Sequence, residues 1–382
     1  MNNHVTKYNS WITALFLMQF SVLLPLSLII NIEYVYIIFT LSLLIISLIV
    51  NRMSFNTLFI LFLVSITLVI ILSMLLHEIP YDVIIYILSG FLVKSIVAIY
   101  VGSNRFDFKY LFEILTLLAW INIFIIAFSI IILNLNEHIN YMRLGYGIVP
   151  SSVILLANLY IYKFKISTLL GFLLTLPLLL LYGSRGTFVV IILFLVLVIV
   201  YFMIKSVKGI ISLAISGVLL GIILYFNMFS KLILYLYNDL GIYSYNLMKF
   251  SRSIEEGFET ASSGRDVLYQ SALNSFFEQP IFGNGVGYSF TYTNTSTHNF
   301  LLQILIESGL IGFLIIFITL AILYYKLFFI NNKYIKVIFL IFTSISVGRL
   351  LISSDLWLRT ELWLLVGITL MFINYKKEIL KE

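Results

Sequence analysis

Long apolar stretches alternate with short polar segments along most of this chain. A helix needs about 20 apolar residues to cross the hydrocarbon core of a bilayer. Stretches near that length cover residues 11–30, 34–50, 57–76, 82–101, 110–133, 148–162, 167–183, 186–204, 209–226, 298–325, 334–352 and 359–375. The pattern predicts an all-α polytopic membrane protein with about 12 transmembrane helices.

One long apolar run is interrupted by the sequence Tyr182-Gly183-Ser184-Arg185-Gly186. An arginine in the middle of a span is energetically costly, so this sequence is expected to form a tight turn at the membrane rim between two spans. Arg185 then either extends toward the interface and fixes the end of a span, or binds an anion. The second role is chemically suitable because a guanidinium group matches phosphate oxygens bidentately.

The longest polar segment covers residues 227–297. Its second part predicts an amphipathic helix, because apolar residues recur at helical spacing from Leu268 to Phe277 and Pro280 ends the run. Ser262 or Ser263 is expected to cap this helix. We expect a single membrane domain with three parts: an N-terminal bundle of about nine helices (1–226), an extracytoplasmic loop (227–297) and C-terminal transmembrane helices (298–382).

The composition supports a lipid environment. The chain is 62% hydrophobic and 10% charged, with a mean hydropathy of +1.09, whereas soluble domains are roughly 45–50% apolar and about 25% charged. It has no cysteine, and its four histidines are far apart in the sequence. We therefore expect no metal site and no cofactor, and the sequence has no nucleotide-binding P-loop.

The positive charges predict the orientation in the membrane. With the N-terminus in the cytoplasm, fourteen of the 23 Lys and Arg residues fall on cytoplasmic segments, in agreement with the positive-inside rule. Both termini are then cytoplasmic, and the 227–297 loop faces outward. The remaining cations include Lys94, Arg185, Arg265, Arg349 and Arg359, and their positions indicate an anionic ligand that approaches from outside.

Arg265 and His298 are the strongest candidates for chemistry. Arg265 lies at the start of the predicted loop helix, where backbone partial charge disfavours a cation unless both bind one anion. The alternative is a solvated arginine paired with Asp266 or Glu259. His298 begins an apolar helix, and a neutral imidazole there could accept a proton from a hydroxyl, with Asn299 or a threonine of Thr291–Thr297 orienting it. The alternative is an interfacial histidine without a catalytic role.

Three other charged residues are candidates for the same site. Lys94 lies in the middle of a predicted span, where a lysine is costly and therefore indicates function. Asp355 and Arg359 lie on the last outer loop, where an ion pair between them is the simpler interpretation. The sequence Gly283-Asn284-Gly285-Val286-Gly287 follows no strand. It predicts either a flexible turn or a loop whose backbone can approach a ligand closely.

Several of these pieces follow one another in a fixed order: Ser184-Arg185-Gly186 between two spans, Gly264-Arg265 before a loop helix, Gly283-x-Gly285, and His298-Asn299 before Glu307-Ser308-Gly309-Leu310-Ile311-Gly312. In this order, and over roughly residues 170–325, the chain resembles the O-antigen polymerase and ligase superfamily of bacterial envelope polysaccharide assembly.

The resemblance implies a multi-pass glycosyltransferase of the bacterial cytoplasmic (inner) membrane, with a type C glycosyltransferase-like fold and an active site facing outward. The donor would be a glycan on undecaprenyl diphosphate. His298 would act as the base on an acceptor hydroxyl, without a metal and with inversion at the anomeric carbon. Arg185, Arg265 and Lys94 would bind the diphosphate. The supporting residues would be Asn299, Glu307, Asp355 and Arg359.

Polymerase is the favoured activity, with a lipid-linked repeat unit of O-antigen or capsule as the acceptor. An O-antigen ligase, which transfers the glycan to lipid A core, shares the motifs and is the alternative. A lipid-linked oligosaccharide flippase is disfavoured, because its cations would extend through many spans in two related halves. Expected partners are the lipid-linked donor and acceptor, a chain-length regulator and a flippase, but no nucleic acid.

Overall fold

The computed structural model describes residues 3–24, 32–77, 79–133, 141–162, 165–203, 228–240, 244–255, 265–293, 297–353 and 355–379. All regular secondary structure in these ranges is helical. The α-helices are α1 (Asn3–Leu23), α2 (Ile32–Val50), α3 (Thr57–Leu76), α4 (Tyr81–Gly90), α5 (Ile96–Ser103), α6 (Phe108–Leu133), α8 (Tyr141–Ile161), α9 (Ile166–Tyr182), α10 (Arg185–Val198), α12 (Met228–Leu234), α13 (Tyr245–Glu255), α14 (Arg265–Glu278), α15 (Tyr288–Thr293), α16 (Phe300–Phe328), α17 (Lys333–Leu350) and α18 (Thr360–Ile379). The π-helical segments η2 (Phe91–Ser95), η3 (Ile199–Met203) and η4 (Tyr235–Asp239) continue α4, α10 and α12.

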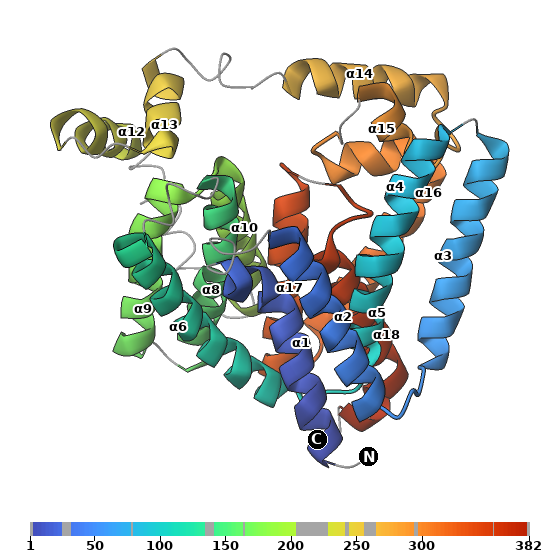
Figure 1. The fold of residues 1–382 in the computed structure, drawn as a ribbon, viewed down its shortest axis with the longest axis horizontal. Helices are drawn as coiled ribbons and strands as arrows, with labels where there is room; N and C mark the ends of the chain where they lie inside the picture. Colours follow the sequence, from blue (N-terminus) through green and yellow to red (C-terminus); the bar gives the residue numbers. More distant parts are fainter. Residues whose placement is uncertain are drawn as a thin grey trace.

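The two ends of the helical bundle differ (Figure 1). Both chain termini lie at one end, close to the connection between α2 and α3, whereas α12, α13, α14 and α15 lie at the opposite end. This arrangement agrees with the predicted separation of the termini from the 227–297 loop. The side of the membrane on which each end lies stays a prediction.

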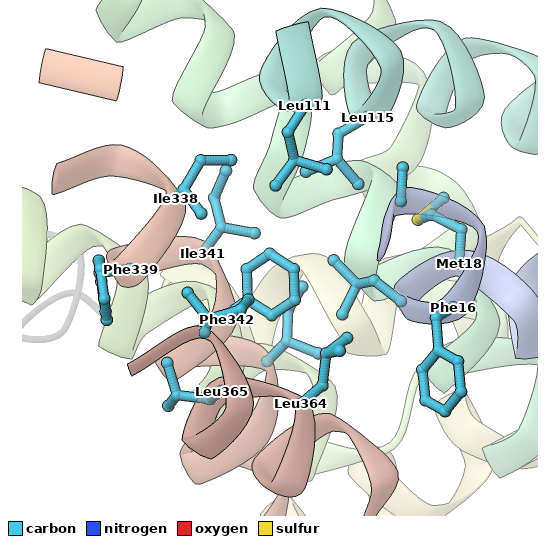
Figure 2. Close-up of a cluster of buried hydrophobic side chains, with 14 of the residues drawn as sticks. Phe16, Met18, Leu111, Leu115, Ile338, Phe339, Ile341, Phe342, Leu364 and Leu365 are labelled. Atoms are coloured by element: carbon cyan, nitrogen blue, oxygen red, sulfur yellow. The ribbon is translucent and has the colours of Figure 1, made fainter. Parts of the chain in front are cut away.

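The core lies where α1, α6, α17 and α18 meet (Figure 2). Its buried side chains include Phe16, Met18, Leu111, Leu115, Phe342 and Leu364. α5 and α18 approach each other closely, because a Cβ built on Gly367 would lie only 3.0 Å from the Gly102 Cα. Small residues at such crossings allow the tight packing that holds helices together in lipid, where the hydrophobic effect does not drive association.

Several helices match the predicted membrane spans. In the part of the chain that the structure describes, five helices are long and apolar enough to cross a bilayer: Thr57–Leu76, Tyr81–Ser103, Phe108–Ile130, Met142–Ile161 and Phe300–Phe328. Three shorter apolar helices cover Tyr34–Val50, Ile166–Tyr182 and Gly186–Phe202. The all-helical fold is therefore confirmed, whereas the number of spans stays a prediction. The predicted span at residues 209–226 lies outside the described residues.

The predicted turn in the long apolar run is confirmed. α9 and α10 are separated by Gly183 and Ser184, both in extended conformation. The Gly183 N–H donates to the Leu179 carbonyl (2.7 Å) and ends α9. The Thr187 hydroxyl donates to the Ser184 carbonyl (2.6 Å) at the start of α10. These local hydrogen bonds place Arg185 at the first position of a helix.

The predicted helix of the outer loop corresponds to α14, which ends shortly before Pro280 and packs against α16. The prediction that it is amphipathic was wrong: Leu273 and Phe277 of the expected apolar face are exposed, whereas Ser275 is buried. Ser262 and Ser263, the expected caps, lie outside the described residues. The sequence did not predict α12, α13 or α15 as separate helices. α13 is attached to the membrane bundle, since the Asn246 amide donates to the Leu180 carbonyl of α9 (2.8 Å).

α16 is interrupted at Gly309, whose φ of 63° and ψ of −167° lie outside the helical region. This conformation is accessible essentially only to glycine. The preceding loop supplies hydrogen bonds at the break: the Leu310 N–H donates to the Pro280 carbonyl (2.9 Å), and the Gly285 N–H donates to the Glu307 carbonyl (3.0 Å). Irregular backbone within a span requires such partners, because lipid offers none.

The glycine-rich loop of residues 283–287 fits closely against two spans. Gly283, Gly285 and Gly287 have φ values of 77°, 96° and 86°. A Cβ on Gly283 would lie 2.6 Å from the Glu307 carbonyl oxygen of α16, and a Cβ on Gly285 would lie 2.8 Å from the His77 ring after α3. The predicted close approach of this loop is therefore an approach to the protein's own helices.

Candidate functional site

Arg265 and His298 are the first pair of candidate site residues. α14 packs against α16, and Arg265, the first residue of α14, acts electrostatically on His298, which lies two residues before α16. His298 is partly buried, and its pKa is lowered from the usual 6.5. Burial is the larger cause, and the positive charge of Arg265 acts in the same direction. The imidazole is therefore neutral at pH 7.

The backbone around His298 is fixed by the cap of α16. His298 has a φ of 55°, in the left-handed region that few residues other than glycine adopt. The next residue, Asn299, is the N-cap, and its side-chain oxygen accepts from the backbone N–H groups of Leu301 (3.0 Å) and Leu302 (3.4 Å). Strained backbone of this kind persists only where neighbouring contacts fix it. Asn299 therefore supports His298 through the helix cap.

Glu307 is buried in α16 and joins three segments of the chain. Its Oε1 accepts hydrogen bonds from Ser289 Oγ (3.0 Å) and Gln303 Nε2 (3.0 Å). Its Oε2 accepts from Trp357 Nε1 (2.8 Å). A buried carboxylate is tolerated only when its oxygens are hydrogen-bonded. Glu307 thus holds α15 and the segment after α17 against the first half of α16.

Asp355 extends this network. Its Oδ2 accepts from Gln303 Nε2 (2.6 Å), and its Oδ1 accepts from the Trp357 N–H (2.7 Å). Burial raises the pKa of the Asp355 carboxyl to about 6. Gln303 therefore links the carboxyl groups of Glu307 and Asp355. In the described ranges, no group of three or more His, Asp or Glu side chains could hold a metal ion.

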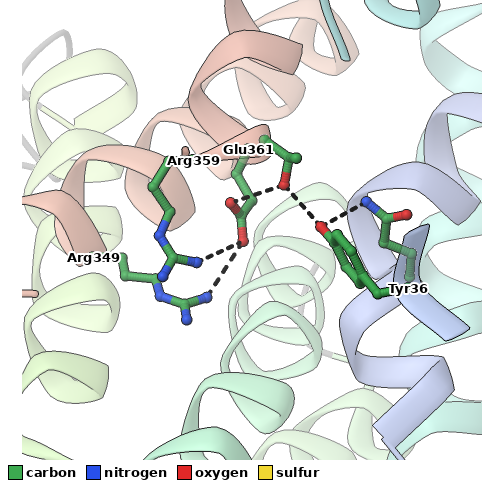
Figure 3. Close-up of polar contacts among 6 residues, drawn as sticks. Tyr36, Arg349, Arg359 and Glu361 are labelled. Carbon is green, nitrogen blue, oxygen red and sulfur yellow. Dashed lines mark hydrogen bonds and ion pairs between the residues drawn. The ribbon is translucent and has the colours of Figure 1, made fainter. Parts of the chain in front are cut away.

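A cluster of charges lies where α17 and α18 meet (Figure 3). Arg349 Nη1 lies 3.4 Å from Glu361 Oε1, and Arg359 Nη1 lies 4.0 Å from the same oxygen. All three side chains are largely buried, with exposed fractions of 15%, 14% and 25% for Arg349, Glu361 and Arg359. One carboxylate thus faces two guanidinium groups.

Tyr36 connects this cluster to Lys94. The Tyr36 hydroxyl is hydrogen-bonded to Thr360 Oγ1 (3.0 Å), which in turn donates to Glu361 Oε2 (3.3 Å). Lys94 Nζ lies 6.0 Å from the centre of the Tyr36 ring, within reach of a cation–π interaction. Lys94 belongs to the π-helical segment η2, and single π turns inside helices are frequent at functional sites.

The turn that carries Arg185 lies beside the same cluster. A Cβ built on Gly186 would overlap the Tyr146 hydroxyl oxygen, so only glycine leaves room there. The Tyr146 ring faces Arg349, whose Cζ lies 4.1 Å from the ring centre. The Arg185 side chain itself lies outside the described part of the structure. Tyr146 therefore connects the Ser184-Arg185-Gly186 turn to Arg349.

The resemblance to a family of polysaccharide assembly rested on the order of several motifs, from Ser184-Arg185-Gly186 to His298-Asn299. Residues 170–317 match the family model described as O-antigen ligase. This match supports the O-antigen polymerase and ligase superfamily, and the resemblance predicted for residues 170–325 is confirmed. A search of curated proteins finds no match to the chain.

The match to the O-antigen ligase family covers α9, α10, the helices of the outer loop and the first half of α16. The predicted site residues inside it are Arg185, Arg265, His298, Asn299 and Glu307. Lys94, Asp355 and Arg359 lie outside it. Asp355 nevertheless contacts the matched segment through Gln303.

The sequence did not assign several residues of these networks to the site, among them Gln303, Arg349, Trp357 and Glu361. Gln303 had a detectable signal, because it lies four residues before Glu307 and therefore on the same face of an apolar helix. Arg349 was noted as a cation against the positive-inside rule but was given no role. Trp357 and Glu361 carried no signal, since their partners are distant in sequence.

Proposed function

We propose that the protein is a polysaccharide polymerase of the bacterial cytoplasmic membrane. It transfers a growing O-antigen or capsular glycan from undecaprenyl diphosphate to a hydroxyl of a lipid-linked repeat unit on the outer face. The coarser class, a glycosyltransferase-like protein of polysaccharide assembly, rests on the family match. The observation that carries the proposed glycosyl transfer is the partly buried His298, whose pKa is lowered, with Arg265 near it at the start of α16.

In the proposed reaction, the acceptor hydroxyl oxygen attacks the anomeric carbon while its proton passes to the His298 imidazole. The bond between the anomeric carbon and the diphosphate oxygen breaks, and the diphosphate leaves with the bonding electron pair. Attack from the side opposite the leaving group inverts the anomeric configuration. A positioned general base of this kind typically contributes about 10²- to 10⁴-fold to the rate.

Cations are proposed to stabilise the leaving group. Negative charge develops on the diphosphate as the bond breaks, and fixed cations in a site with little water stabilise that charge without reorganisation. Arg265 and Arg185 can each offer two parallel N–H donors to phosphate oxygens, whereas Lys94 acts as a point charge. The residues proposed to support this site are Asn299, Glu307, Asp355 and Arg359.

The test of the catalytic proposal is His298→Ala, expressed in cells that lack the wild-type protein. The variant should remain in the membrane with wild-type thermal stability, while the rate of polymer formation falls about 10²- to 10⁴-fold. Electrophoresis of surface glycan measures the outcome. His4→Ala is a matched control, because His4 is exposed and lies near the N-terminus, at the other end of the bundle. Polymer of normal length and amount with His298→Ala would refute the assignment.

O-antigen ligase is the second candidate, since the matching family model carries that description. The two activities share the donor and differ in the acceptor. Deletion of the protein separates them: single repeat units on lipid A core indicate loss of a polymerase, whereas long chains left on the carrier lipid indicate loss of a ligase.

A further inference from the structure

Arg349 is a buried cation whose guanidinium N–H groups are not all used in hydrogen bonds. Its Nη1 lies 3.4 Å from Glu361 Oε1, whereas a strong charge-assisted hydrogen bond is roughly 2.7–2.9 Å long. Its Nε is buried and has no hydrogen-bond partner. Leaving a buried donor of a charged group unsatisfied is costly, so such an atom needs an explanation.

Two more unsatisfied atoms lie at the same place. Seven buried side-chain polar atoms in the described residues lack a partner, and three of them belong to Arg349, Tyr146 and Ser184. The Tyr146 ring lies under the Arg349 guanidinium. A Cβ on Gly186 would overlap the Tyr146 hydroxyl and would lie 3.6 Å from Ser184 Oγ. Three buried donors without a hydrogen-bond partner therefore belong to residues that contact one another at the turn that carries Arg185.

The charge balance indicates the sign of the missing ligand. Glu361 faces both Arg349 and Arg359, and Asp355 brings a second negative charge near Arg359. Lys94 adds a further positive charge near Tyr36. An N–H donor, two O–H donors and an excess of positive charge fit an oxyanion with several acceptor oxygens, such as a phosphate group.

We propose that Arg349, Tyr146 and Ser184 bind a phosphate group of the diphosphate-linked donor and form the buried wall of the site at the Arg185 turn. Arg349 supplies guanidinium N–H donors, and the two hydroxyls donate to further phosphate oxygens. Glu361 holds the Arg349 side chain in position while no donor is bound. This inference rests on the proposed function, because it takes the donor to be diphosphate-linked.

The test is binding of undecaprenyl diphosphate to the purified full-length protein in detergent, measured by titration calorimetry. Arg349→Gln should weaken binding about 100-fold, and Tyr146→Phe and Ser184→Ala should each weaken it about tenfold, as expected for lost hydrogen bonds to a charged group. Arg252→Gln removes an exposed arginine of α13 and is the matched control with unchanged affinity.

Tyr146→Phe separates a binding role from a structural one. Removal of an unsatisfied buried hydroxyl should not lower thermal stability, so a purely structural Tyr146 predicts wild-type affinity in a protein at least as stable as wild type. The proposal predicts weaker binding in that same stable protein. Wild-type affinity in both Tyr146→Phe and Ser184→Ala overturns the proposal, even where Arg349→Gln fails to fold.

Two comparisons distinguish this inference from the proposed function. If the wild type and His298→Ala bind undecaprenyl diphosphate but the three variants bind it equally well, only this inference fails. If the wild type does not bind the probe, the proposed function fails with it. Inorganic phosphate is the second probe. Loss of phosphate binding in Arg349→Gln with unchanged affinity for undecaprenyl diphosphate would assign the site to a free phosphate and overturn the lipid assignment.

Discussion

At the scale of single residues, the protonation state of His298 depends on two neighbours of different kinds. Burial disfavours the imidazolium because it removes water, and Arg265 disfavours it by charge repulsion. The same Arg265 is proposed to hold the diphosphate. One arginine would therefore serve both substrates, by binding the donor and by keeping the base ready for the acceptor proton.

Arg265→Gln should shift the pH dependence of glycan transfer. Loss of the positive charge allows the imidazolium to form more easily, so the pKa of His298 rises toward its usual value. The neutral base is then lost at a higher pH, and the acidic limb of the rate profile moves upward. Burial remains, so the shift is partial. Transfer rates measured between pH 5 and 8 report this limb, since an unperturbed histidine titrates near pH 6.5.

The control for that profile is Arg252→Gln, which removes an exposed arginine of α13 and should leave the acidic limb in place. If neither Arg265→Gln nor the control moves the acidic limb of the rate profile, Arg265 does not set the pKa of His298.

Candidate residues could be recognised from the sequence where their position depends only on neighbouring residues. Arg265 and His298 were assigned because each lies at a helix start, and a helix start can be recognised from neighbouring residues. The proposed phosphate-binding residues Tyr146, Ser184 and Arg349 could not be assigned in this way. Tyr146, Ser184 and Arg349 come from α8, the turn before α10 and α17. No periodic pattern records that their side chains meet.

At the scale of elements, the break in α16 explains two motifs together. Gly309 interrupts the helix, and residues 280–287 provide the hydrogen bonds that the break requires. The glycines of the loop and the glycine of the span are thus parts of one contact. The sequence showed both motifs but not their pairing, because the hydrogen bonds join segments more than 20 residues apart.

Gly309→Ala should strongly destabilise the protein. The φ of 63° with ψ of −167° costs a residue with a Cβ about 1–3 kcal/mol, and that Cβ would also overlap the Ile281 carbonyl. We expect a melting temperature several degrees lower and little protein in the membrane fraction. Leu310→Ala is the control, because Leu310 is 48% exposed and its truncation leaves the break intact. Equal melting temperatures for the two variants would contradict this account of the break.

At the scale of the whole molecule, the apolar pattern predicted the all-helical fold because lipid permits few alternatives. A span must satisfy its own backbone, and a helix does so from local sequence. The packing of these helices did not follow from that rule. In lipid, contacts depend on small residues and shape, as at Gly102 and Gly367. A hydropathy pattern contains little of that information.

The predicted orientation can be tested with single cysteines, because the natural chain has none. Asn274→Cys lies exposed on α14, and Ser54→Cys lies exposed between α2 and α3 at the end that holds the termini. We expect a membrane-impermeant maleimide to label Asn274→Cys on intact spheroplasts, and Ser54→Cys only after the cells are opened. Labelling of Ser54→Cys in intact spheroplasts would reverse the topology.

The contact between the glycine-rich loop and α16 has a consequence for biosynthesis. Residues 280–287 leave the ribosome before α16 does, so the hydrogen-bond partners of the break at Gly309 are made before the break enters the bilayer. We expect the outer loop to be translocated first and to form its hydrogen bonds with α16 as that helix is inserted. α17 and α18, which carry Arg349 and Glu361, arrive later. Arg349 would thus join the phosphate-binding residues of α8, the Arg185 turn and α14 only after His298 has been made.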